Sequence, residues 1–228
     1  MTEHVAPSEP EQRGVFWDGR YERIGSKQVS WYQTRPQMSL DLIDALQLGV
    51  STAVIDVGGG TSTLVDELLR RDFSDITVLD VSASALATAR QRLGDPDKVT
   101  WLHADVLTWD PARDWDLWHD RALFHFLTSS EDQDKYLQRI DRALRPGGGF
   151  IIGTFAADGP DHCSGLPVER YDARGLIDLV SGALGDVLVV EQRREIHTTP
   201  SGVSQPFIWI AGTVGQSKAD DDHASAPA

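Results

Sequence analysis

The chain of 228 residues is 40% hydrophobic and carries a formal net charge of −14. This length suits a single α/β domain that buries a sizeable core. The negative charge argues against a nucleic-acid partner, because neutralising phosphates requires clustered Lys and Arg. No apolar run is long enough to cross a bilayer, and the N-terminus lacks a basic region followed by a hydrophobic one, so we expect a cytoplasmic protein without a membrane partner.

The two ends of the chain differ in composition from the rest. Residues 1–14 are polar and contain proline, and residues 215–228 are rich in Asp, so we expect a flexible N-terminal tail and a disordered C-terminal tail. One domain is expected over residues 15–214. The single cysteine excludes an internal disulfide and a cysteine-based zinc site, and no His pair has metalloprotease spacing, so we expect no metal.

Aromatic residues gather before the first predicted strand, in the segments FWDGRY at 16–21 and VSWYQTRP at 29–36. Aromatic faces attract cations, which makes Trp31 and Tyr32, with Trp17 behind them, candidates to surround a positive ligand or to contact a substrate. The alternative for Trp17 is a hydrophobic contact, of the kind called a hydrophobic staple, that anchors a surface helix. Arg35 is a candidate for a bidentate contact with a carboxylate.

The first predicted strand, at 53–57, runs into a glycine turn in the segment AVIDVGGGT. Gly58 and Gly60 admit positive φ angles and let a ligand approach the backbone. Asp56 supplies a charge that repels a phosphate and attracts an ammonium. A dinucleotide site has a third glycine where this chain has Thr63. A purely structural turn is the alternative.

Acids also follow the second and third predicted strands, at 76–80 and 99–103. Asp80 lies 24 positions after Asp56, where doubly wound folds place an acid that accepts hydrogen bonds from ribose hydroxyls, with Val81 beside it. Asp105 and Val106 follow the third strand at the same edge of the sheet. Capping of the next helix is the alternative for either acid.

The fourth predicted strand, at 115–119, ends in the polar segment HDR before the segment ALFHF. Asp120 and Arg121 face the ligand-binding edge on a functional interpretation and form a plain ion pair on a structural one. His125 lies on a predicted short helix, where its pKa range would let it act as a base. A packed structural histidine is the more common outcome.

The last part of the chain contains a turn-rich loop and three further strands, predicted at 149–154, 187–194 and 205–213. The loop at 154–171 holds His162, Cys163 and Arg170, and we expect it to contact the substrate. His162 and Cys163 are adjacent, so their side chains point to opposite faces of an extended segment, which argues against a nucleophilic pair. Only a loop joins the last two strands, which predicts antiparallel pairing.

Predicted helices near 39–48, 62–71, 83–93, 131–144 and 173–184 separate most of the strands, and this alternation predicts a mostly parallel, doubly wound sheet. The acids in register with the D-x-G-x-G turn and the PGG turn at 146–148 resemble the motifs of class I S-adenosylmethionine (SAM) methyltransferases. The aromatic opening resembles a bacterial group that is related to citrate synthase lysine methyltransferase and to trans-aconitate methyltransferase-like proteins. The resemblance covers residues 16–214.

This resemblance implies a Rossmann-like, seven-stranded, mostly parallel sheet with an antiparallel last strand. It implies SAM as the cofactor and S-adenosylhomocysteine (SAH) as its product. Asp105 is then expected to bind the adenine amino group and Asp120 to lie at the floor of the methyl-transfer site, while residues 16–36 form a lid.

The expected activity is methyl transfer to an oxygen, nitrogen or sulfur acceptor, most simply on a small molecule. A protein lysine methyltransferase is the alternative within the same class, and a non-catalytic SAM-binding protein is the alternative from another class. A nicotinamide oxidoreductase is disfavoured by Thr63. The sequence indicates no oligomeric state.

Overall fold

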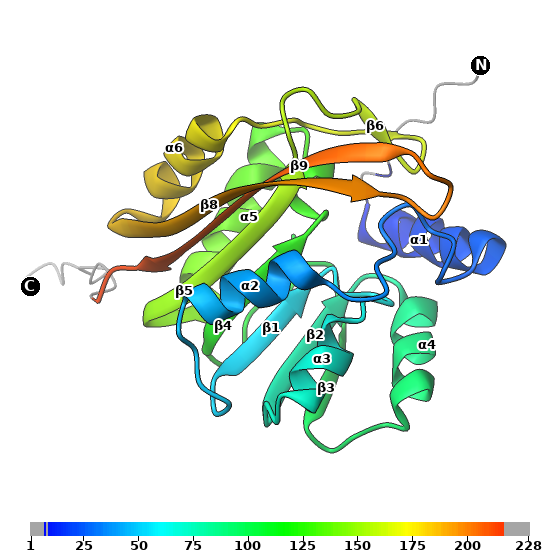
Figure 1. The fold of residues 1–228 in the computed structure, drawn as a ribbon, viewed down its shortest axis with the longest axis horizontal. Helices are drawn as coiled ribbons and strands as arrows, with labels where there is room; N and C mark the ends of the chain where they lie inside the picture. The colour runs from blue at the N-terminus through cyan, green and yellow to red at the C-terminus, as the bar shows by residue number, and fades with distance from the viewer. Residues whose placement is uncertain (1–6, 8, 217–228) are drawn as a thin grey trace, which may run out of the picture.

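A seven-stranded sheet forms the centre of the protein in the computed structural model, which describes residue 7 and residues 9–216 (Figure 1). The strand order is β3-β2-β1-β4-β5-β9-β8. The strands are β1 (Ala53–Val57), β2 (Asp75–Asp80), β3 (Val99–His103), β4 (Trp115–Arg121), β5 (Leu144–Phe155), β8 (Val187–Thr198) and β9 (Ser204–Val214). Neighbouring strands are parallel except where β9 pairs antiparallel with both β5 and β8. The predicted fold class is therefore confirmed.

Helices cover both faces of this sheet and give it two hydrophobic cores. One core packs against α2 (Gln37–Ala45), α3 (Leu64–Arg70) and α4 (Ala83–Leu93). The other packs against α5 (Ser130–Ala143) and α6 (Ala173–Leu184). Figure 1 shows α2 and α3 in front of the strands and α5 behind them. All five residues of β1 are buried, as expected for an apolar strand with helices on both faces.

Polar caps explain why three helices begin where the sequence predicts. The side chains of Ser82, Ser129 and Asp172 accept hydrogen bonds from backbone N–H groups of the first turns of α4, α5 and α6. Gly94 ends α4 in the left-handed conformation, which glycine adopts without a Cβ penalty. These local signals are readable in the sequence, and the predicted helix bounds lie within three residues of the observed ones.

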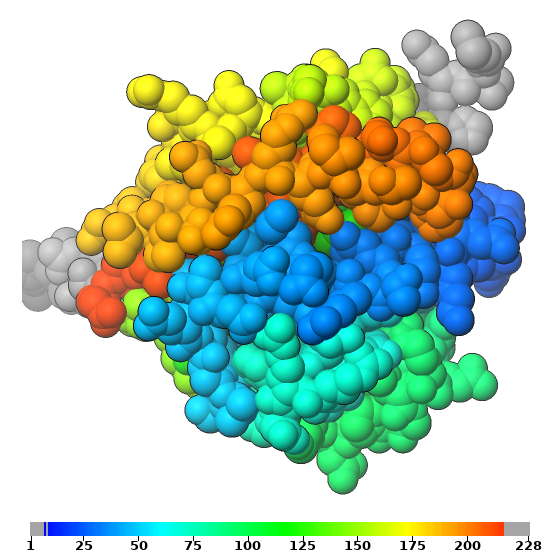
Figure 2. All heavy atoms as spheres, in the orientation of Figure 1, coloured from blue at the N-terminus to red at the C-terminus, as the bar shows by residue number. Residues whose placement is uncertain are grey.

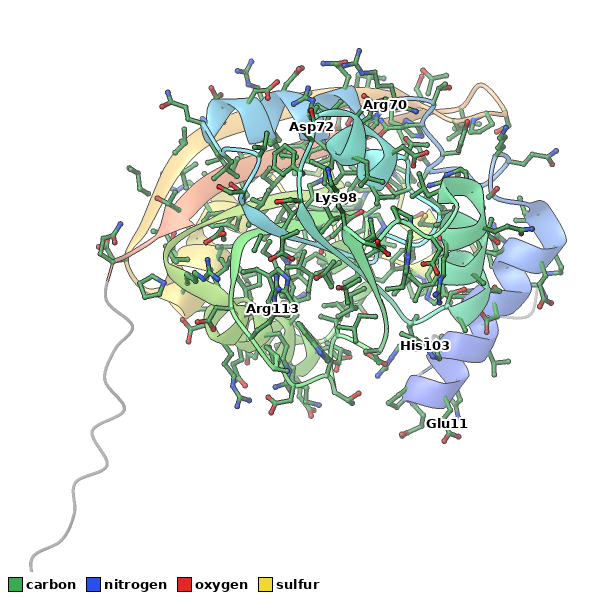
Figure 3. All side chains as sticks on the ribbon, turned by 90° about the horizontal axis from the view of Figure 1, so that it is seen from below. Glu11, Arg70, Asp72, Lys98, His103 and Arg113 are labelled. Carbon is green, nitrogen blue, oxygen red and sulfur yellow. The ribbon has the colours of Figure 1, made fainter. Side chains whose placement is uncertain are left out.

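The N-terminal helix α1 (Pro10–Ile24) begins inside the segment that the sequence predicts to be a tail. Pro10 suits the first helical turn, where its missing N–H is not needed. A Cβ at Gly14 would lie 3.2 Å from the carbonyl oxygen of Val81, so this glycine lets α1 approach the end of β2. Figures 1 and 3 show α1 beside α4. The apolar pattern of α1 is weak because it packs on the cavity described below.

β9 ends at Val214, and the next residue still hydrogen-bonds to the sheet. Gly215 donates to the carbonyl of Asp186 at 2.7 Å and accepts from the N–H of Gly147 at 2.9 Å. The tail is predicted at 215–228, and residues 217–228 lie outside the described residues, as do residues 1–6 and 8. No helix in the described part of the chain has the length and apolar character needed to span a membrane.

Short elements lie in the connections that follow β4 and β5. The 3-10 helix η1 (Phe124–Phe126) follows β4, as predicted. Between β5 and α6, β6 (His162–Cys163) and β7 (Leu166–Pro167) form a small hairpin. Figure 3 faces the opposite edge of the sheet, where Asp72, Lys98 and Arg113 precede β2, β3 and β4.

Candidate active site

Two connected cavities lie at the carboxyl ends of the parallel strands, where the strand order switches between β1 and β4. Open α/β sheets bind their ligands at this position. The larger cavity has a volume of about 110 Å³ and the smaller about 30 Å³. Both are lined by Trp31, Gly58 and Arg121, which therefore mark their junction. Figure 2 shows the N-terminal segment, in blue, packed between the β8–β9 pair and the α3–α4 region.

The glycine turn after β1 has the backbone that the sequence predicts. Gly58 and Gly60 have φ angles of 69° and 46°. A Cβ at Gly58 would lie 2.7 Å from Leu123, and one at Gly60 would lie 2.5 Å from the hydroxyl of Tyr21. The backbone N–H of Gly58 donates to the carbonyl of Leu79 at 2.8 Å, which fixes the turn against β2. Any larger residue at these positions would close the space beside the turn.

Asp56 places one oxygen of its carboxylate in a buried network and leaves the other free. Its Oδ1 shares a hydrogen bond of 2.7 Å with His119 Nδ1, and His119 Nε2 shares one of 2.9 Å with Ser39 Oγ. Its Oδ2 is buried without a hydrogen-bond partner within the described residues. Asp56 lines the smaller cavity. A buried carboxylate oxygen in this position fits the ammonium of an amino-acid group.

The chain Ser39–His119–Asp56 has the connectivity of a hydrolase triad, but its surroundings do not suit one. All three side chains are buried. Neither cavity has Ser39 or His119 among the described residues that line it. The network therefore orients Asp56, and the serine lacks the access that a nucleophile needs.

Asp80 and Asp105 lie at the larger cavity, as do their neighbours Val81 and Val106. Asp80 accepts from the N–H of Ser82 at 2.7 Å. Burial raises the pKa of Asp80 to about 7, and the nearby Asp56 adds to the rise. Asp105 accepts from Arg13 Nε at 2.6 Å. Both acids thus face a space that can hold a ligand with several hydroxyl or amino groups.

A cluster of aromatic residues, the aromatic cover, lines one wall of the larger cavity. Trp31 packs edge-to-face against Trp17 at 5.7 Å and against Tyr21 at 5.8 Å, and Trp17 packs against Phe126 at 5.0 Å between ring centroids. All four residues line this cavity. A cation placed here would contact aromatic faces, an interaction worth about 0.5–2 kcal/mol.

Sequence reasoning missed Arg13 and Tyr21 as residues of the site. Together with Trp17 they occur at intervals of four, so one face of α1 presents all three to the larger cavity. The four-residue spacing of these three residues indicates one face of a helix. This helix is not predicted from the sequence, because Arg13 lies in the segment 1–14 that is predicted to be a flexible tail. Leu123, Phe126 and Leu127, which line the same wall from the segment around η1, were also missed.

Asp120 and His125 lie behind the cavity wall, and neither is among the described residues that line it. Asp120 accepts from the hydroxyl of Tyr136 at 2.5 Å and from the N–H of Leu123 at 2.9 Å. Burial raises the pKa of Asp120 to about 6, although these hydrogen bonds oppose the rise. Asp120 thus holds the turn that presents Leu123 to the cavity.

The His125 ring is buried against Phe155 and Phe126, with ring centroids 4.4 and 4.5 Å away. Neither ring nitrogen has a hydrogen-bond partner in the part of the chain that the structure describes. Burial lowers the pKa of His125 to about 3, and the charge of Arg121 adds to the decrease. At neutral pH the ring is therefore uncharged, and it is a weak base.

The remaining predicted residues divide between the cavities and the surface. Tyr32 lines the smaller cavity and Cys163 the larger. Arg35 lies 3.5 Å from Glu67 with 57% of its side chain exposed. His162 is exposed beside Asp161, and Arg170 Nη1 donates to the carbonyl of Gly159 at 3.1 Å. His162 and Cys163 thus point to opposite faces of β6, one exposed and one buried.

The donor set of the site is poor in metal ligands. Within the described residues, no group of three or more His, Cys, Asp or Glu side chains is arranged to hold a metal ion. Three features do suit the cofactor that the sequence predicts. They are the free oxygen of Asp56, the space that a Cβ would fill at the glycine turn, and the two acids of the larger cavity.

Comparison with known proteins agrees with this interpretation. Residues 54–148 match a family model described as a methyltransferase domain. A malonyl-[acyl-carrier protein] O-methyltransferase from Ilyobacter polytropus is 26% identical over 57% of the chain and 50% of the relative. An EEF1A lysine methyltransferase 2 from Danio rerio is 25% identical over 66% of the chain and 71% of the relative. A trans-aconitate 2-methyltransferase from Pseudomonas aeruginosa is 29% identical over 54% of the chain and 43% of the relative.

Solved structures share the fold over nearly the whole chain. A 1,6-didemethyltoxoflavin-N1-methyltransferase from Burkholderia thailandensis, solved with SAH, gives a TM-score of 0.69 at 19% identity and covers 93% of both chains. The [4+2]-cyclase SpnF gives 0.70 at 16% identity and covers 94% of this chain and 98% of the cyclase. The fold alone therefore does not fix the reaction.

Residues 54–148 thus match a methyltransferase domain, and the whole sheet has the Rossmann-like fold of the solved methyltransferase. The free oxygen of Asp56, the glycine turn and the two acids of the larger cavity suit SAM as a ligand. The chain spans about half the length of the malonyl-[acyl-carrier protein] O-methyltransferase that it matches.

Proposed function

We propose that this protein transfers the methyl group of SAM to an oxygen, nitrogen or sulfur atom of a small molecule. The observation that carries the proposal is the placement of three acids along one edge of the sheet. Asp80 and Asp105 face the larger cavity, and Asp56 faces the smaller one with a free oxygen. Ribose hydroxyls, an adenine amino group and an ammonium are the groups that these three carboxylates would bind.

When bound, SAM supplies a methyl group that is already activated by a positive sulfonium. The task of the protein is then to orient the donor and the acceptor, which can supply several kcal/mol of the barrier reduction. Gly58 leaves room for the ligand beside the turn, and Asp56 would hold its amino end. Trp31 and Trp17 would offer aromatic faces to the positive sulfur and exclude water from the larger cavity.

In this proposal Asp120 and His125, the two predicted catalytic residues, support the cavity wall and do not touch the ligand. Asp120 holds Leu123 and the η1 turn, and the His125 ring forms the packed layer behind Phe126. His125 would serve as a general base only if a movement opened its ring to the cavity. A carboxylate or thiol acceptor would need no base, because it is deprotonated or easily deprotonated at neutral pH.

A small-molecule acceptor is supported by the cover over the site. Residues from α1 and the Trp31 segment line the larger cavity, and its volume of about 110 Å³ suits a small acceptor. Protein lysine methylation is the second candidate, since the relative from Danio rerio is named for that activity. Membership of the trans-aconitate methyltransferase-like group is part of the proposal and is supported by the Pseudomonas relative.

Calorimetry with SAM, SAH and NADH tests the cofactor. We expect the purified chain to bind SAM and SAH, and binding of NADH alone would contradict the proposal. Incubation of cell lysate with protein and radiolabelled SAM tests the acceptor. Label in the small-molecule fraction supports the first candidate, label in polypeptide supports the second, and SAM binding without any labelled fraction supports a non-catalytic binding protein.

A further inference from the structure

Arg121 ends β4 at the junction of the two cavities, and only part of its guanidinium group is satisfied. Its Nη1 donates to the carbonyl oxygen of Trp31 at 2.7 Å. Its Nε and Nη2 are buried and have no hydrogen-bond partner among residue 7 and residues 9–216. A buried donor without a partner loses its hydrogen bonds to water without replacement, and the loss is greater when the donor is charged. Two such donors on one side chain indicate a place for a ligand.

The charge of Arg121 also lacks a direct counter-ion. No carboxylate of the described residues forms an ion pair with it, although Glu195 and Asp56, whose Oδ2 is free, act on its charge from farther away. Glu195 accepts from Gln33 Nε2 and from Trp209 Nε1, both at 2.9 Å. Burial lowers the pKa of Arg121 to about 10, so the group still carries its charge at neutral pH. A buried cation of this kind is stabilised by an anion that enters the site.

The free edge of the guanidinium has a defined shape. Nε and Nη2 lie on the same edge of the planar group, so their N–H bonds are nearly parallel. A carboxylate accepts two parallel hydrogen bonds of this kind, one on each oxygen. The unsatisfied atoms of Arg121 therefore match a carboxylate in both charge and geometry.

The side chain of Arg121 also reaches the strand at the far side of β5. β4 lies between β1, which carries the glycine turn, and β5. The guanidinium carbon of Arg121 lies 5.3 Å from the ring centroid of Phe207, on β9 beyond β5. Arg121 therefore connects the smaller cavity, which it lines with Asp56, to the wall that β9 forms. Cys163 lies in the wall of the larger cavity to which Arg121 contributes.

We propose that Arg121 binds a carboxylate of the methyl acceptor, so that the acceptor is a small organic acid. This inference rests on the proposed function, because it takes the larger cavity beside Cys163 as the acceptor site. Arg121 is then a residue that determines specificity. A neutral analogue of the acceptor would leave the two buried donors unsatisfied and would be rejected.

Calorimetry on the SAH-saturated chain tests the proposal with three acids, malonate, succinate and benzoate, and with the neutral amide of each. We expect at least one acid to bind, and its amide to bind at least about tenfold more weakly. Arg121→Gln should lower the affinity for that acid by about tenfold or more and leave the affinity for SAH within about twofold of the wild-type value. Arg194→Gln is the matched control, since Arg194 is exposed on β8 and pairs with Asp158.

Three results would overturn the proposal. The first is a loss of SAH affinity of about tenfold in Arg121→Gln, which would mean that Arg121 binds the carboxylate of the cofactor. The second is equal affinity for the acids and their amides. The third is that none of the three acids binds to the SAH-saturated chain. A wild-type chain that does not bind SAH would count against the proposed function instead. If Arg121→Gln fails to fold, Arg121→Lys takes its place, because lysine keeps the charge without the planar edge. We then expect weak acid binding and an unchanged melting temperature.

Discussion

Asp80 is a carboxylate whose burial favours ligand binding and opposes folding. Its folded-state pKa of about 7 lies above the ordinary value of 3.8. Between these two values the folded chain binds more protons than the unfolded chain, so stability falls as the pH rises. The cost is complete above about pH 7, where the carboxylate is ionised in both states. Hydroxyl groups of a bound ligand would offset that cost.

Asp80→Asn is therefore expected to separate stability from binding. At pH 8 the free energy of unfolding should rise by about 1–3 kcal/mol, because a neutral amide is cheaper to bury than a charge. The affinity for SAH should fall by about tenfold or more, because a charged acceptor of two hydroxyl hydrogen bonds is lost. Denaturant titration and calorimetry measure the two quantities. Asp75→Asn, at the exposed start of the same strand, is the control.

The pH dependence of binding gives a second measurement on this residue. Ligand hydroxyls favour the ionised form, so SAH affinity should increase from pH 6 through the pKa of about 7 and level off about one pH unit above it. Asp80→Asn should flatten this rise. A wild-type affinity that is constant over the whole range would remove Asp80 from the binding site.

Trp31→Ala tests the aromatic cover at the same scale. SAM carries a positive sulfonium and SAH does not. Loss of a cation–π contact should therefore lower the affinity for SAM more than the affinity for SAH. The expected difference is about two- to tenfold, since such contacts are worth about 0.5–2 kcal/mol. Calorimetry with both ligands measures it, and Trp31→Phe should restore most of the preference for SAM. An equal loss of both affinities would leave Trp31 with a packing role only.

At the scale of elements, α1 is the helix that closes the site. Asp18 accepts from Ser82 Oγ at 2.6 Å and from the N–H of Ser84 at 3.0 Å, which ties α1 to the start of α4. Arg13 donates to Asp105 at 2.6 Å from the same helix. Asp105, which we propose to bind the adenine amino group, is therefore already paired, and a ligand in this position would compete with Arg13 for it.

Arg13→Gln should remove that competition. Because the ion pair is partly buried and must break when Asp105 takes a ligand amino group, we expect SAH affinity to increase by about two- to fivefold. Calorimetry measures the change, and Arg23→Gln in the last turn of α1 is the control. A decrease in affinity would instead make Arg13 a ligand of the cofactor.

Most elements of the sheet were predicted because their signals are local. Apolar runs mark the central strands, and Ser82, Ser129 and Asp172 mark helix starts. The helix α1 was not predicted, because its side chains pack on a cavity that other segments form. The hairpin of β6 and β7 was not predicted either, since each strand has two residues and no periodicity to detect.

At the scale of the whole molecule, β9 joins the parallel strands to the edge strand β8. Trp209 lies buried at the centre of β9, and a Cβ at Gly153 would come within 2.5 Å of its ring. The indole Nε1 donates to Glu195 at 2.9 Å. This residue therefore connects β9 to both of its neighbours, and its packing supports the wall on which Arg121 rests.

Trp209→Leu should lower the free energy of unfolding by about 2–4 kcal/mol, because it opens a cavity and leaves Glu195 with one fewer donor. Denaturant unfolding measures the loss. SAH affinity should stay within about twofold, since Trp209 is not among the described residues that line the cavities. A large loss of SAH affinity at temperatures where the variant is folded would contradict this separation of fold and site. Trp101→Leu, half-buried on β3 near the other edge of the sheet, is the comparison.

The fold class, the glycine turn after β1 and the acids at the carboxyl edge of the sheet are all predicted from the sequence. They are predictable because a strand that contains Asp56 and leads into Gly58 and Gly60 gives short-range signals, and the carboxyl ends of parallel strands meet at one edge. The packing of α1 over this edge, and the place of Asp120 and His125 behind the cavity wall, are seen only in the tertiary structure. It also left two donors of Arg121 unsatisfied. Burial and partner choice depend on segments far apart in the chain, which no local pattern records.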